Sequence, residues 1–215
     1  MKDLLISRAD FSPFFWELIG TPYKPLPRNL DALEGLRTKA DYNTGSLSYL
    51  DCVDVHALAS YFKPTSVAEV GTFIGRSTHS LAAGMDEGEI WTCDSSNALD
   101  LPPPENAVTI RQFKKTNSTE MFAKAMTLGF RFDLFYIDGR LTERDVELMS
   151  ECIAFDGSVI VLDDFEGVEK GVANASMLLN WSARNAKNYT LIYPQTGRKT
   201  AVLVPFNRIR FVPQV

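Results

Sequence analysis

The residues of this chain that could do chemistry begin with a glycine motif. An apolar run over residues 67–70, which includes Glu69, ends at Gly71, and Gly75 follows four residues later. The first glycine lets a strand turn sharply, and the second lets the backbone approach a ligand where a Cβ atom would collide. Residues 76–83 read as a helix whose N-terminal amides face the same crevice. The alternative to a ligand-binding loop is a glycine-containing turn of the kind found in any α/β protein.

The spacing of these glycines argues against a dinucleotide fold. Such folds carry Gly-x-Gly-x-x-Gly after the first strand, and this pattern occurs nowhere in the chain.

Polar residues follow the other strands that the sequence predicts. Asp94 lies 19 residues beyond Gly75, a spacing at which an acidic residue can accept both hydroxyls of a ribose. The remaining strand ends carry Asn117-Ser118, Asp138 and Asp163-Asp164. Because ligands of open parallel sheets bind outside the carboxyl ends of the strands, we expect these groups to share one site. The alternative is that they only cap helices and form turns.

The elements that position these residues alternate between strand and helix, which predicts an α/β fold. Short apolar runs predict parallel strands over residues 66–70, 89–93, 107–113, 132–137 and 158–162. Helical periodicity and caps predict helices over residues 48–63, 76–83, 119–128, 142–154 and 168–185. A proline run, Leu101 to Pro104, predicts a loop instead of a helix.

Two further strands are expected near the C-terminus, over residues 189–193 and 200–204. Their six-residue connection is too short for a parallel crossover, so they form an antiparallel hairpin. The sequence therefore predicts a seven-stranded sheet with one reversed strand.

Residues 1–47 differ from the rest, so we expect an N-terminal extension before a domain over residues 48–215. Ser12 followed by Pro13 is typical of a helix start, which predicts a short helix over residues 14–19. An irregular segment is expected after it because prolines recur, at Pro22, Pro25 and Pro27. The aromatic side chains here could pack on the domain, meet a second copy in a homodimer, or form a lid over a substrate. They are Phe11, Phe14, Phe15, Trp16 and Tyr23.

Composition narrows the function classes. The net charge of −5 over 215 residues argues against a broad phosphate-binding face, so we expect no nucleic-acid partner. No apolar run approaches the length of a membrane span, and charged residues interrupt the start of the chain where a signal peptide would be apolar. The three cysteines lack Cys-x-x-Cys spacing. We expect a cytoplasmic protein with reduced cysteines and no membrane contact.

The glycine motif, with Asp94 after it and the terminal hairpin, resembles the class I S-adenosylmethionine-dependent methyltransferases. Two stretches, Tyr136 to Gly139 and Val161 to Asp164, are similar to those of the small-molecule O-methyltransferases. The resemblance covers residues 48–205 and implies a Rossmann-like doubly wound sheet in the order 3-2-1-4-5-7-6, with the last strand antiparallel.

The resemblance also implies a cofactor site for S-adenosylmethionine. Glu69 and Gly71 would bound the methionine end, Asp94 would hold the ribose, and Asn117-Ser118 would flank the adenine. The full set of expected cofactor-binding residues is Glu69, Gly71, Thr72, Phe73, Gly75, Ser77, Asp94, Ser95, Asn117, Ser118 and Asp138.

In the metal-dependent members of that family, a divalent ion binds carboxylates after the fourth and fifth strands. The matching residues here are Asp138, Asp163 and Asp164, three hard oxygen ligands suited to Mg²⁺. A solvated acidic rim with helix-capping aspartates is the alternative.

Catalysis is assigned to Asp138 and Arg140, but the general base is open. The family often carries a lysine or histidine three residues after the strand-four aspartate, and Leu141 stands there. Arg140 is too basic to deprotonate a hydroxyl, although it could clamp an acidic substrate. Lys170 and Glu166 are alternative bases.

Methyl transfer to a hydroxyl of a small molecule is thus the leading hypothesis. A protein that keeps the cofactor pocket without catalysis is the second, because the usual base is missing. A nicotinamide-dependent oxidoreductase is the third, and the glycine spacing argues against it. A methyltransferase of nucleic acid or protein is disfavoured by the charge.

Overall fold

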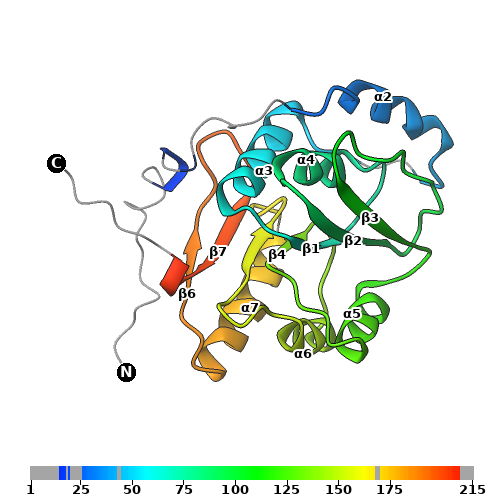
Figure 1. The fold of residues 1–215 in the computed structure, drawn as a ribbon. Helices are drawn as coiled ribbons and strands as arrows, with labels where there is room; N and C mark the ends of the chain where they lie inside the picture. The colour runs from blue at the N-terminus through cyan, green and yellow to red at the C-terminus, as the bar shows by residue number, and fades with distance from the viewer. Residues whose placement is uncertain (1–14, 18, 20–25, 43–44, 168–169, 209–215) are drawn as a thin grey trace.

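The structure is a computed structural model that describes residues 15–17, 19, 26–42, 45–167 and 170–208. Within this part of the chain, seven strands form one sheet in the order β3-β2-β1-β4-β5-β7-β6 (Figure 1). The strands are β1 Ser66–Val70, β2 Gly88–Asp94, β3 Val108–Lys114, β4 Leu134–Ile137, β5 Val159–Leu162, β6 Tyr189–Ile192 and β7 Ala201–Pro205.

The strand order and direction confirm the predicted sheet. The first five strands are parallel, and β7 runs antiparallel to both of its neighbours, β5 and β6. Because β1, β4 and β5 lie at the centre, almost every side chain on them is buried on both faces of the sheet. The carboxyl ends of these strands carry the residues singled out above.

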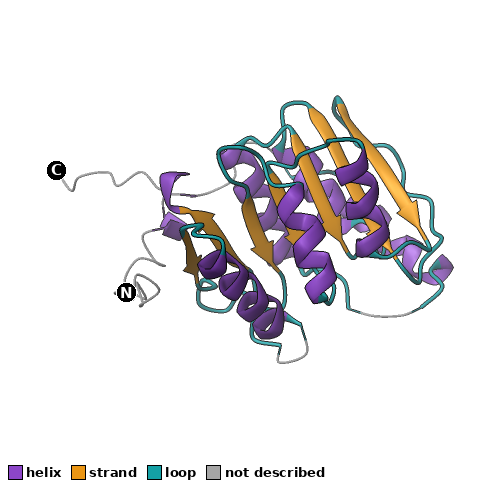
Figure 2. Cartoon of the chain, turned by 90° about the horizontal axis from the view of Figure 1, so that it is seen from below, coloured by secondary structure: helices purple, strands orange, loops and turns teal. Residues whose placement is uncertain are grey.

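Helices cover both faces of the sheet (Figures 1 and 2). Besides a helical stretch at residues 15–17 and 19, the helices that the described residues form are α2 Leu30–Glu34, α3 Tyr49–Phe62, α4 Arg76–Gly84, α5 Ser118–Thr127, α6 Glu143–Glu151 and α7 Gly171–Arg184, with 3₁₀ turns η1 Gly35–Lys39 and η2 Phe206–Arg208. Two helices begin with the predicted capping box: Ser48 pairs with Asp51 at α3, and Thr142 pairs with Asp145 at α6. The loop predicted from the proline run is also present, because residues 95–107 form no helix.

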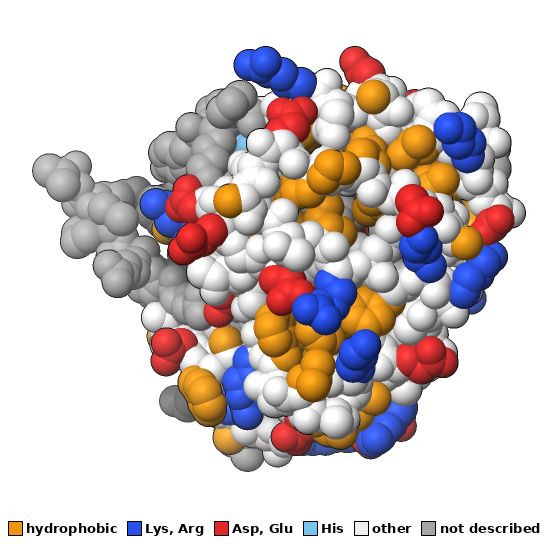
Figure 3. Space-filling model, turned by 45° about the vertical axis from the view of Figure 1, so that its right-hand side comes forward, with side chains coloured by type: hydrophobic (Ala, Val, Ile, Leu, Met, Phe, Trp, Pro, Cys, Tyr) orange, Lys and Arg blue, Asp and Glu red, His pale blue; other side chains and the backbone are white. Residues whose placement is uncertain are grey.

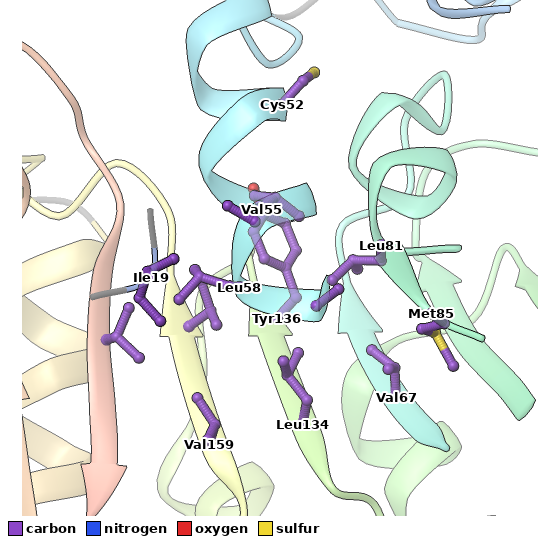
Figure 4. Packing of buried hydrophobic residues seen from close by; sticks show 14 of the residues in the cluster. Ile19, Cys52, Val55, Leu58, Val67, Leu81, Met85, Leu134, Tyr136 and Val159 are labelled. Atoms are coloured by element: carbon purple, nitrogen blue, oxygen red, sulfur yellow. The ribbon is translucent and has the colours of Figure 1, made fainter. Parts of the chain in front are cut away.

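Two apolar clusters hold the layers together. One lies under α3 and α4, where Leu58 and Leu81 pack on Val67, Leu134 and Tyr136 of the sheet (Figure 4). The other joins α5, α6 and α7 to the opposite face of the sheet. On the face of the described residues seen in Figure 3, acidic and basic side chains are interspersed, so it carries no extended basic patch.

The N-terminal part of the chain contains two short elements after the expected irregular segment. The short α2 and η1 were not predicted, since no side-chain cap marks their starts. Phe15 and Trp16 are helical as predicted, and they are buried in the first cluster. The Trp16 indole donates a hydrogen bond to the backbone oxygen of Tyr193 at 2.8 Å. These two aromatics therefore pack onto the sheet domain.

The remaining N-terminal predictions fall outside the described residues. They concern Phe11, Ser12, Pro13, Phe14, Pro22, Tyr23 and Pro25. A lid and the division of the chain at residue 47 stay predictions.

The fourth strand is shorter than predicted. Phe132 was expected to open the fourth strand, but it forms only an isolated bridge to Ile153, and β4 begins at Leu134.

None of the helices in the described ranges is long and apolar enough to cross a membrane.

Candidate functional site

The glycine loop connects β1 to α4 through a run of left-handed backbone. Gly71, Phe73 and Gly75 have φ values of +100°, +43° and +81°. The Gly71 amide donates to the Cys93 oxygen at 3.0 Å, and the Gly75 amide donates to the Thr72 oxygen at 2.8 Å. The loop is thereby tied to the end of β2 and closed on itself.

Gly75 lies close to another part of the protein. A Cβ atom there would lie 2.6 Å from a Cδ atom of Leu101, and a contact of this glycine with a ligand stays a prediction. Gly71 has a different neighbour, because its Cβ would lie 3.3 Å from the backbone of Asp138. The first glycine therefore brings the loop against the end of β4.

Glu69 is fully buried beneath this loop. Its two carboxyl oxygens accept hydrogen bonds from Ser77 and Thr78, each at 2.5 Å, which fixes the first turn of α4. Burial raises the pKa of Glu69 to about 7, although the hydroxyls of Ser77, Thr78 and Thr92 act in the opposite direction. The hydroxyls of Thr72 and Thr92 also form a hydrogen bond with each other, with their oxygens 2.5 Å apart. Glu69 holds the loop in place, and a contact with a ligand stays a prediction.

Asp94 lies at the end of β2 with a carboxylate that accepts four hydrogen bonds. One oxygen accepts the amides of Ser96 and Asn97 at 2.9 and 2.8 Å. The other accepts the Phe73 amide at 2.9 Å and the Tyr42 hydroxyl at 2.7 Å. Asp94 thus links the glycine loop, its own turn and the N-terminal part of the chain.

Tyr42 packs on the glycine loop beside Asp94. Its ring lies 5.1 Å from the ring of Phe73, centroid to centroid, and the guanidinium of Arg37 lies 5.2 Å from the Phe73 centroid. Burial and the neighbouring Asp94 carboxylate raise the pKa of Tyr42 above its usual range, so its hydroxyl keeps its proton and donates.

The residues expected near an adenine make hydrogen bonds within the protein. The Asn117 side chain accepts the Glu120 amide at 2.9 Å, and the Ser118 hydroxyl donates to Asp145 of α6 at 3.0 Å. Ser95 is exposed in the turn after Asp94. Contact of these residues with a cofactor stays a prediction.

Three carboxylates, which the sequence placed after the fourth and fifth strands, converge beyond β4 and β5. Each of Asp138, Asp163 and Asp164 offers an oxygen, and these oxygens lie within 4.8 Å of one another. Burial, together with the charges of Asp138 and Asp164, raises the pKa of Asp163 to about 8. Burial also raises the pKa of Asp138, although Lys170 acts in the opposite direction.

Two lysines bind these carboxylates. The Lys170 ammonium forms a short ion pair with the Asp138 carboxylate and another, at 2.9 Å, with Asp164. Lys199 pairs with the second oxygen of Asp164 at 3.2 Å. Burial raises the pKa of Asp164, but the two lysines outweigh it, so its pKa lies below the usual value.

The carboxylates of Asp138, Asp163 and Asp164 are chemically suited to Mg²⁺, since hard carboxylate oxygens are its preferred ligands. The residues present nevertheless do not fit a divalent ion. Lys170 already places a cation on one carboxylate oxygen of Asp138 and on one of Asp164.

A pocket of about 520 Å³ opens beside the lysines. Its lining contains Arg140 and Glu166 as well as the charged groups just described, and both are exposed side chains. The structure therefore brings Asp138, Arg140, Glu166 and Lys170 to one cavity.

Three contributors to this site were not predicted. Tyr42 precedes Asp94 by 52 residues, so no spacing rule connects them. Lys199 lies in the hairpin connection, where the sequence reads as a surface turn. Asn97 is buried and donates to the Phe73 oxygen at 2.8 Å, and its place three residues after Asp94 could have indicated this turn.

No protein-family model and no curated protein sequence matches the chain. Solved structures do match. An O-methyltransferase from Bacillus cereus, in complex with SAH, aligns at a TM-score of 0.60 and 14% identity, covering 90% of this chain and 96% of that one. TomG from Streptomyces achromogenes, an O-methyltransferase in complex with SAM, aligns at 0.57 and 17% identity, covering 91% and 96%. Cofactor-bound Rv0187 from MTB aligns at 0.58 and 20% identity, covering 82% and 88%.

The chain has the O-methyltransferase fold. At these low identities the likeness establishes the fold alone, so the activity has to be argued from the residues.

Proposed function

We propose that this chain is an S-adenosylmethionine-dependent methyltransferase that acts on a hydroxyl of a small molecule. The observation that carries the proposal is the Asp94 carboxylate at the end of β2, beside the left-handed turn that Gly71, Phe73 and Gly75 form. Asp94 accepts a hydroxyl donor, that of Tyr42. A ribose hydroxyl is a donor of the same kind, so these residues fit the nucleoside.

The roles of the loop residues follow from their contacts. Asp94 would hold the ribose, and the backbone between Gly71 and Gly75 would border the amino-acid end of the cofactor. Glu69 would keep the loop in this shape through Ser77 and Thr78. Bound S-adenosylmethionine supplies an electrophilic methyl group.

The chain's own contribution to the reaction is alignment and charge. The cavity beyond β4 would hold the acceptor in position. Asp138, next to Gly71 and at the wall of this cavity, would accept the proton of the acceptor hydroxyl. Arg140 would bind an anionic part of the acceptor, because a guanidinium pairs well with carboxylates and phosphates.

Turnover measured as release of S-adenosylhomocysteine, over a panel of hydroxylated small molecules, tests this proposal. An Asp138→Asn variant should lose about 100-fold or more in turnover, the usual effect of removing a general base. An Arg140→Gln variant should raise KM for acidic acceptors and leave neutral ones unchanged. Tight binding of S-adenosylhomocysteine without turnover of any acceptor would instead indicate a cofactor-binding protein without catalysis.

A further inference from the structure

The Lys170 ammonium lies where two of the three converging carboxylates meet. It contacts the Asp138 carboxylate, the Asp138 backbone oxygen at 3.2 Å and the Asp164 carboxylate at 2.9 Å. A lysine ammonium has three N–H donors, so these three oxygens give each of them an acceptor. Lys170 is therefore held among protein oxygens as a bound cation would be.

Contacts of Gly171 and Asn174 fix the start of α7, which directly follows Lys170. Gly171, the first residue of α7, lies close to the turn after β5. A Cβ atom on it would be 2.4 Å from the backbone oxygen of Asp164. Asn174, one turn later and 2% exposed, donates to the Gly139 oxygen at 2.8 Å and accepts the Leu141 amide at 3.0 Å. The start of α7 is thus fixed to the loops after both β4 and β5.

Charge supports the same interpretation. Carboxyl groups whose oxygens lie within 4.8 Å repel one another when they are ionised, and cations beside them reduce this repulsion. Lys170 and Lys199 are two such cations, and Lys170 is the more enclosed, with 25% of its side chain exposed against 63% for Lys199.

We propose that the ammonium of Lys170 takes the place of a divalent ion at Asp138 and Asp164, so that methyl transfer by this chain needs no metal. The part about methyl transfer rests on the proposed function, whereas the exclusion of the ion does not. Lys170 neutralises the carboxylates and fixes Asp138 for the acceptor hydroxyl, and a divalent ion would have to displace it from the same oxygens.

Binding of Mn²⁺, followed by electron paramagnetic resonance, tests the exclusion directly. The wild-type protein should bind no Mn²⁺ at this site up to about 1 mM, whereas Lys170→Met, which frees the carboxylates, should bind it at least about tenfold more tightly. Adding Asp163→Asn to Lys170→Met should abolish the gain. Lys114→Met is the matched control, because it removes a lysine from an ion pair with the exposed Asp100, outside the site.

Two results would overturn the proposal. One is wild-type binding of Mn²⁺ that Asp163→Asn removes, and the other is a folded Lys170→Met variant that gains no binding. Circular dichroism establishes that each variant is folded. Calorimetry with S-adenosylhomocysteine, run on the same samples, reports separately on the proposed function. Failure of the metal-exclusion proposal is therefore distinguishable from failure of the methyltransferase proposal.

Discussion

The Tyr42 hydroxyl donates a hydrogen bond of 2.7 Å to the Asp94 carboxylate, the group that we assign to the ribose. The N-terminal part of the chain and the proposed cofactor site are therefore in direct contact. A ribose hydroxyl that binds the same oxygen has to compete with Tyr42.

A Tyr42→Phe variant should accordingly bind S-adenosylhomocysteine more tightly. The substitution keeps the ring against Phe73 and frees the Asp94 oxygen, and one hydrogen bond to a charged group corresponds to a gain of about tenfold to a hundredfold. Isothermal titration calorimetry measures it. The control is Tyr49→Phe on the exposed Tyr49, which should change nothing. Weaker binding by Tyr42→Phe would mean that the hydroxyl is itself a ligand contact.

The stability of the fold should depend on pH through Glu69. Its pKa is about 7 in the folded chain against an ordinary value of 4.5, so the folded state binds more protons between these values. The free energy of unfolding should therefore fall as pH rises from about 4.5 to about 7, by about 3 kcal/mol from this residue, and stay level above that.

Glu69→Gln isolates this contribution, because an amide can still bond the hydroxyls of Ser77 and Thr78 without titrating. Urea unfolding at pH 5 and pH 8 gives the comparison. The wild-type protein should lose more stability between the two pH values than the variant does. Equal losses would show that Glu69 has an ordinary pKa in the folded chain.

The two glycines Gly75 and Gly197 separate backbone strain from steric collision. Their φ values are similar, +81° and +77°, but a Cβ atom at Gly75 would meet Leu101 at 2.6 Å, whereas nothing lies within 4 Å at Gly197. Gly197→Ala should cost roughly 1–2 kcal/mol of unfolding free energy for the left-handed backbone. Gly75→Ala should cost a further 1–3 kcal/mol or so, for the overpacking against Leu101.

Urea unfolding of the two alanine variants at one pH measures these costs. A similar loss for both would mean that Leu101 moves aside freely and that the contact does not restrain the loop.

Much of this fold was predictable from the sequence because its signals are local. The capping pairs Ser48–Asp51 and Thr142–Asp145 mark helix starts within four residues of chain, and both formed as predicted. The strands were predicted for a similar reason: β1 is apolar apart from Ser66 and Glu69, and its predicted and observed bounds agree.

The contacts that complete the site were not predictable in this way. Tyr42 meets Asp94, and Leu101 meets Gly75, across segments that no periodicity or spacing connects. The convergence of Asp138, Asp163 and Asp164 followed from adjacent parallel strands, but the arrival of Lys170 among them depends on where α7 begins. Long-range packing decides such contacts.

The most direct test of the central claim is calorimetric titration with S-adenosylmethionine and S-adenosylhomocysteine, against NAD as the control ligand. We expect micromolar binding of both sulfur nucleosides, none of NAD, and a loss of about tenfold to a hundredfold in Asp94→Asn, which removes a charged acceptor. The control is Asp100→Asn, which changes an exposed carboxylate in the loop after β2. It should bind both sulfur nucleosides as the wild type does. No binding of either sulfur nucleoside, or binding that Asp94→Asn leaves unchanged, would contradict the account.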